Sequence, residues 1–188
     1  IGFYSLYFAS KYKNLNIMSF EPIVENFDQI NRSIKLNNYH NISNFNYALS
    51  NSQEEKTMWV TDLNKKGGFS IYEEEDFKKE IYNYNYDENK LSKTKVLSQI
   101  FDKNFKISDK KILIKIDIER HELFCLKGMK KLLHESNNKI FMQVEITNFY
   151  KNQVFKILEN YGFKLIHAIS LSEENESDGL DYYFTNYD

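Results

Sequence analysis

The chain has 188 residues, of which 41% are hydrophobic and 16% aromatic, and its formal net charge is −2 at pH 7. This length and composition are typical of one folded domain, predicted over residues 1–188, and they exclude a disordered chain or a strongly basic nucleic-acid binder. The sequence has no apolar run long enough to span a membrane, and its single cysteine, Cys125, excludes an intrachain disulfide and favours a reducing, cytoplasmic environment.

Apolar periodicity in the first third of the chain predicts helices that alternate with strands. Glu21 and Pro22 open the second helix, because proline suits a first helical turn. The chain begins on an apolar, aromatic-rich helix without an initiator Met, so we expect a segment to precede it in the parent protein. The predicted elements are a helix over 3–12, a strand over 16–20, a helix from 22 to about 37, and strands over 42–49 and 57–61.

Residues 64–93 interrupt this alternation and are predicted to form a loop insert. They contain Gly67-Gly68, an acidic run over 73–76 and a stretch rich in Tyr and Asn. A charge run of this kind is usually a solvated face, although the interleaved aromatic residues also fit a lid over a substrate.

The second half of the chain predicts further strand–helix units and a closing pair of strands. Gly128 lies inside a predicted helix, at a cost of roughly 1 kcal/mol relative to alanine, so we expect close packing there. The whole order predicts an α/β fold with a mostly parallel sheet, helices on both faces and an antiparallel C-terminal strand. The elements are a short edge strand over 94–97, a helical turn over 98–103, a strand from Ile112, a helix over 123–133, a strand over 140–146, a helix over 153–161 ended by Gly162, and strands over 163–169 and 182–187.

The stretch from Ile112 to Glu122 carries the clearest functional signal. An apolar run typical of a buried strand ends in Asp117 and Glu119, and Arg120, His121 and Glu122 follow. The carboxyl ends of strands in an open α/β sheet face the ligand crevice, so this segment predicts the mouth of an active site. The alternative is that the acids only stabilise the start of the next helix.

Several short motifs follow one another in a recognisable order. They are Ile1-Gly2-Phe3-Tyr4-Ser5, Phe20-Glu21-Pro22, Asn37, Ala48-Leu49-Ser50, Gly67-Gly68-Phe69-Ser70, KIDIERHE over 115–122, and Val144-Glu145. Each motif is weak alone, but their order and spacing, from residue 1 to about residue 170, resemble the FkbM family of S-adenosylmethionine-dependent methyltransferases. The resemblance implies a Rossmann-like class I methyltransferase fold and S-adenosyl-L-methionine as cofactor.

Two departures from the family pattern stand out. The chain begins inside the first motif, so the first strand of the family fold and its acid–glycine turn are expected to be missing from this chain. Arg120 stands where the family usually has glycine. A glycine there would permit a positive φ or a close backbone approach.

The resemblance also implies which residues contact the cofactor. Glu21 would accept hydrogen bonds from the ribose hydroxyls, by the logic of dinucleotide folds, although a carboxylate there can also serve as a helix-start charge. Gly2 would be the last glycine of the cofactor loop, or simply allow helix packing. Residues Tyr47, Ala48 and Leu49 would flank the adenine, although core packing explains them nearly as well.

Asp117, Glu119 and His121 are the candidate catalytic residues. Asp117 would orient the acceptor hydroxyl or contact the amino group of the cofactor, while Glu119 or His121 would take the proton, since histidine has the more suitable unperturbed pKa. A lone histidine near a helix start is more often a surface residue. Ser70 and Glu145 are the candidate substrate contacts, and an ordinary turn explains Ser70 equally well.

These residues lead to one principal function and two alternatives. The principal function is O-methylation of a hydroxyl on a small-molecule or glycan acceptor, such as a sugar or secondary metabolite, with no nucleic acid as partner. One alternative is a metal-dependent nucleotide-sugar transferase that uses Asp117 and Glu119, although hard cations want several oxygen ligands and no second acidic cluster is evident. The other is an inactive, truncated methyltransferase-like domain.

Overall fold

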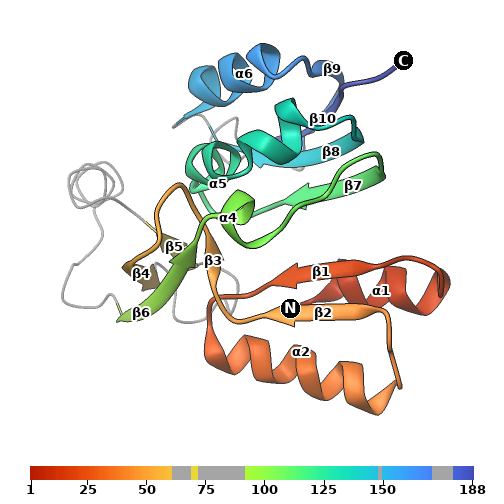
Figure 1. Ribbon diagram of the computed structural model, residues 1–188. Helices are drawn as coiled ribbons and strands as arrows, with labels where there is room; N and C mark the ends of the chain where they lie inside the picture. Colours follow the sequence, from red (N-terminus) through yellow and green to blue (C-terminus); the bar gives the residue numbers. More distant parts are fainter. Residues whose placement is uncertain (61–68, 72–91, 148–149, 171–179) are drawn as a thin grey trace.

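The computed structural model describes residues 1–60, 69–71, 92–147, 150–170 and 180–188 (Figure 1). Its strands form one two-stranded and two four-stranded sheets. Three neighbouring strand pairs are parallel and four are antiparallel. The expected α/β class is therefore confirmed as a mixed α/β fold, whereas the expectation of a mostly parallel sheet is wrong for the described strands. The predicted insert over 64–93 lies outside the described residues, apart from 69–71 and 92–93.

The N-terminal part of the chain forms the smallest sheet. Strand β1 (Ile17–Phe20) pairs in parallel with β2 (Ile42–Phe45), and helix α2 (Val24–Leu36) connects them. Helix α1 (Phe3–Lys11) precedes β1, and Figure 1 shows both helices beside this strand pair. Helices α1 and α2 and strand β1 match the expected elements, including the end of α2, where Asn37 is the C-cap.

The C-terminal part contains the main core. Its sheet has the order β7 (Lys111–Ile116), β8 (Lys139–Ile146), β10 (Leu180–Thr185) and β9 (Lys164–Ser170), and β10 is antiparallel to both of its neighbours, as expected for the C-terminal strand. Alternate side chains of β8 are buried, because a strand turns every second residue to the same face. They pack in one core with residues of α5 (Glu122–Gly128) and α6 (Lys151–Asn160).

The third sheet has the order β3 (Ala48–Leu49), β6 (Ser92–Gln99), β4 (Glu55–Val60) and β5 (Phe69–Ile71). Residues 94–97 were expected to be an edge strand, and within this range β6 does pair with β4 alone, whereas Ser98 and Gln99 also pair with β3. Its alternating lysines resemble an edge, but Val96 and Ser98 on the other face are buried. Helix α4 (Phe101–Asn104) follows, so the helical turn predicted over 98–103 begins later than expected, because Ser98 and Gln99 belong to β6.

Two predicted elements are divided in the structure. The strand over 42–49 is split into β2 and β3, and the amide of Asn46 in the break donates to the carbonyl oxygens of Glu21 and Pro22. The helix over 123–133 is split into α5 and a π-helical turn, η2 (Lys131–Glu135). Within the described ranges, no helix combines the length and apolarity needed to cross a bilayer.

Candidate active site

Two predicted site residues meet at the carboxyl ends of β7 and β8. The parallel register pairs Ile116 with Val144, so Asp117 and Glu145 follow on neighbouring strands. Their carboxyl groups are hydrogen-bonded, and Glu145 is half-buried while the Asp117 side chain is 43% exposed. The hydrogen bond with Asp117, burial, and the negative charges of Asp117 and Glu119 raise the pKa of Glu145 to about 8. The carboxyl pair therefore keeps a shared proton to a higher pH than an isolated glutamate would.

A largely buried ion pair, formed by Lys115 of β7 and Asp181 of β10, lies beside this carboxyl pair. The ammonium of Lys115 lies 2.9 Å from Asp181 Oδ1 on β10 and 3.5 Å from Asp117 Oδ2. Burial pulls the pKa of Lys115 down, but the hydrogen bond with Asp181 and the charges of Asp117 and Asp181 outweigh it, so the pKa is raised. Lys115 also lies 5.7 Å from the centre of the Tyr4 ring on α1. A permanent positive charge thus stands beside the carboxyl pair.

The turn that follows β7 has an uncommon backbone conformation. Glu119 and Arg120 both have positive φ angles, 52° and 75°. The positive φ that would favour glycine at position 120 is therefore present, and in this chain arginine adopts it. The carboxylate of Glu122 accepts hydrogen bonds from the backbone N–H groups of Ile118 and Arg120, at 3.4 and 3.1 Å.

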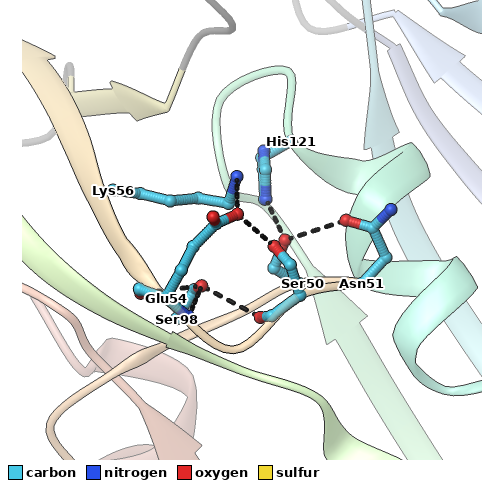
Figure 2. Close-up of polar contacts among 7 residues, drawn as sticks. Ser50, Asn51, Glu54, Lys56, Ser98 and His121 are labelled. Atoms are coloured by element: carbon cyan, nitrogen blue, oxygen red, sulfur yellow. Dashed lines mark hydrogen bonds and ion pairs between the residues drawn. The ribbon is translucent and has the colours of Figure 1, made fainter.

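His121 is buried, not on the surface. It is 2% exposed, its ring stacks on Phe124, and its Nε2 lies 3.0 Å from the hydroxyl of Ser50, which is itself fully buried. Figure 2 shows this contact, together with the hydrogen bond from the Ser50 hydroxyl to Asn51. A second group of polar contacts beside it joins Ser52, Glu54 and Lys56 to Ser98 of β6. His121 therefore connects the turn after β7 to the end of β3.

Glu21 lies just before α2, whereas Gly2 lies just before α1 and close to the side chain of Ile30 in α2. Oε1 of Glu21 accepts a hydrogen bond from the Ile23 backbone at 2.9 Å, so the helix-start role is observed. Burial raises the pKa of Glu21, while hydrogen bonds with Ile23 and Asn26 oppose that shift. Gly2 is the N-cap of α1 with φ 63°, and an added Cβ atom would lie 2.8 Å from the side chain of Ile30. Both residues thus have structural roles, and the predicted cofactor contacts remain predictions.

The residues predicted to flank the adenine are packed in the protein. Tyr47 lies between β2 and β3, where its ring is 5.8 Å from that of Phe20, and burial raises its pKa. Ala48 is buried with Ile23 and Met58, and Leu49 packs against the main core. Ser70 lies in β5 opposite Trp59, while Gly67 and Gly68 lie outside the described residues.

The structure thus brings Asp117, Glu119 and Glu145 together. His121 is instead buried against Ser50. Sequence reasoning missed three contributors: Lys115, Glu122 and Asp181. Lys115 and Glu122 belong to the KIDIERHE motif, so their closeness to Asp117 in the sequence could have marked them as site residues. Asp181 belongs to none of the motifs. In the described part of the chain, no three His, Cys, Asp or Glu side chains are placed to hold one metal ion.

Comparisons with known proteins give the family. The model of the methyltransferase FkbM domain matches residues 1–165. A solved structure, the methyltransferase FkbM from Methylobacillus flagellatus KT, is 14% identical with a TM-score of 0.48, and the match covers 89% of this chain and 36% of that one. The chain therefore spans little more than a third of that structure's length. A search of curated proteins found no significant match. Because the family model covers most of the sequence, this chain belongs to the FkbM methyltransferase domain family.

Proposed function

We propose that this chain is the methyl-transferring part of an S-adenosyl-L-methionine-dependent enzyme that methylates a hydroxyl oxygen of a small-molecule or glycan acceptor. The observation that carries the proposal is the hydrogen-bonded pair of Asp117 and Glu145 at the ends of two parallel strands, in a chain of this family. Ligands of open α/β sheets bind at such strand ends.

The residues at the strand ends suit the methyl donor. Glu21 is half-buried and its carboxylate accepts hydrogen bonds from Ile23 and Asn26. A carboxylate offers about four acceptor sites, so it can also accept hydrogen bonds from ribose hydroxyls. Gly2, Tyr47, Ala48 and Leu49 would line the nucleoside, and Asp117, which is partly exposed, would face the amino group of the methionine part. When bound, the cofactor supplies a methyl group activated by its sulfonium.

The carboxyl groups after β7 and β8 would handle the acceptor. A hydroxyl oxygen must lose its proton as it gains the methyl group, so the protein must orient the hydroxyl and receive the proton. Asp117, whose charge is balanced by Lys115, would orient it. Of the two proposed proton acceptors, Glu119 is exposed whereas His121 is buried against Ser50, which favours Glu119. Glu145 and Ser70 are the proposed substrate contacts.

We also propose that the β1–β2 and β7–β8–β10–β9 sheets belong to one Rossmann-like sheet, with a further strand between β1 and β7. Both strands lie at an end of their own sheet, and their arrows point the same way in Figure 1. Met18 and Phe20 of β1 already pack against the main core. Hydrogen exchange in the full-length protein tests the arrangement: slow exchange along the outer edge of β7 supports it, and rapid exchange opposes it.

Binding of S-adenosylhomocysteine to the full-length protein, measured by calorimetry, tests the cofactor site. Glu21→Gln removes a charge-assisted acceptor and should weaken binding by about tenfold or more. Glu25→Gln is the matched control, because Glu25 is exposed in the first turn of the same helix. Absence of binding to the wild-type protein, together with manganese-dependent binding of a nucleotide sugar, would instead favour the transferase alternative.

Transfer of a labelled methyl group to a panel of hydroxylated acceptors tests the reaction. Asp117→Asn and Glu119→Gln should each lower the rate by about a hundredfold or more while S-adenosylhomocysteine still binds to Glu119→Gln. Full activity of both variants would remove these carboxylates from the mechanism.

A further inference from the structure

The turn over Ile118–His121 holds two successive residues in the left-handed region, where side chains other than glycine are disfavoured. Such a backbone persists only where surrounding contacts determine it. Glu119 is one of these two residues, so the direction of its carboxylate depends on what stabilises the turn.

Glu122 supplies the stabilising contact. It is only 4% exposed, and its Oε1 atom accepts hydrogen bonds from the backbone N–H groups of Ile118 and Arg120. One carboxylate oxygen of Glu122 thus links Ile118, which precedes the left-handed pair, to Arg120, which is the second residue of that pair. By contrast, Glu25 in the first turn of α2 is exposed.

We propose that Glu122 is a positioning residue: through its hydrogen bonds to the turn, it sets where the Glu119 carboxylate stands relative to Asp117 and Glu145. The consequence for catalysis rests on the proposed function, but the positioning itself does not.

Electrostatic interactions support this geometry. The negative charge of Glu119 acts on both Glu145 and Glu122, so it lies within reach of the carboxyl pair and of the residue that holds the turn. Burial and the charge of Glu119 raise the pKa of Glu122 to about 7, while the backbone hydrogen bonds oppose that shift. The buried Cys125 thiol on α5 also faces Glu122, whose charge adds to burial in raising the pKa of that thiol.

The titration of Glu145 reports the position of Glu119. In full-length protein with ¹³C-labelled glutamate, the Glu145 signal is assigned with Glu145→Gln and followed by NMR across pH. Glu119→Gln should lower the pKa of Glu145 by roughly half a unit or more, because it removes a nearby negative charge. Glu122→Ala should approach this shift, since the turn no longer holds Glu119 in place. Glu122→Gln retains an acceptor oxygen and should leave the pKa of Glu145 within about 0.2 units of wild type.

A folded Glu122→Ala protein in which Glu145 titrates as in wild type would overturn the proposal. So would an unchanged titration in Glu119→Gln, because Glu119 would then lie away from the pair. If Glu122→Ala does not fold, the substitution is made in an Arg120→Gly background, whose turn is less strained, and the shift is measured there against Arg120→Gly alone. Because none of these titrations involves methyl transfer, a wild-type enzyme that transfers no methyl group would refute the proposed function and leave the positioning result standing.

Discussion

Gly128 lies so close to Ser50 that an added Cβ atom would be 2.0 Å from the Ser50 carbonyl oxygen. The hydroxyl of the same serine is hydrogen-bonded to His121, the N-cap of the helix that Gly128 ends. Both ends of α5 are therefore fixed to the end of β3. The turn that contains Glu119 leads directly into α5. The contacts with Ser50 therefore also restrain the position of this turn.

Gly128→Ala is expected to destabilise the protein by about 2 kcal/mol. Overpacking against a backbone atom costs about 3 kcal/mol, since a carbonyl cannot rotate away as a side chain can, and the better helix propensity of alanine returns about 1 kcal/mol. Urea denaturation measures the loss. Gly162→Ala is the comparison, because its φ is 83° but no atom lies within 4 Å, so only the left-handed backbone costs, by about 1 kcal/mol. A Gly128→Ala protein as stable as wild type would contradict the close approach.

Much of the fold could be predicted because apolar periodicity is a local property. Strand β8 and helix α6 each carry their pattern within a few residues, and Gly128 and Gly162 mark a close contact and a helix end. The order of strands is not local. Nothing within 94–97 shows which strands β6 pairs with, since its partners β3 and β4 lie more than 30 residues upstream.

The candidate site divides in the same way. Asp117 and Glu145 each end a recognisable strand, and the parallel register of β7 and β8 brings them together. The burial of His121 depends on Ser50, which is 71 residues away, and the balance of charge at Lys115 depends on Asp181, 66 residues away. Such contacts follow from the packed fold and not from spacing in a motif.

Arg120→Gly is expected to stabilise the protein by about 0.5–1 kcal/mol. The left-handed conformation at Arg120 costs an L-residue about 1–2 kcal/mol, and the greater freedom of glycine in the unfolded chain offsets part of that gain. Thermal denaturation of the two proteins measures the difference. Lys127→Gly, on the exposed side of α5, should have the opposite sign and cost about 1 kcal/mol, because its backbone is helical. A loss of stability in Arg120→Gly would show that the side chain contributes more than the backbone strain costs.

The contact between Ser50 and His121 should appear as a coupling energy. Both residues are buried and their polar atoms are 3.0 Å apart, so each single substitution leaves one buried polar group without this partner. Ser50→Ala and His121→Phe, the latter keeping a ring against Phe124, should together cost less than the sum of the two, by about 0.5–1.5 kcal/mol. Chemical denaturation of the four proteins closes the cycle, and strict additivity would mean that the hydrogen bond adds nothing.

The stability of the protein should fall as the pH rises from about 5 to about 8.5. The pKa of Glu145 is raised from its ordinary value of 4.5 to about 8, first by its hydrogen bond with Asp117, and burial raises that of Glu122 to about 7. In this range the folded state binds more protons than the unfolded state, so protons stabilise the fold, and this contribution is lost as the pH passes through the folded pKa values. The urea midpoint measured across pH checks the sign. Glu145→Gln should flatten the upper part of the profile and Glu25→Gln should not, whereas an unchanged slope in Glu145→Gln would show that the carboxyl pair does not carry this pH dependence.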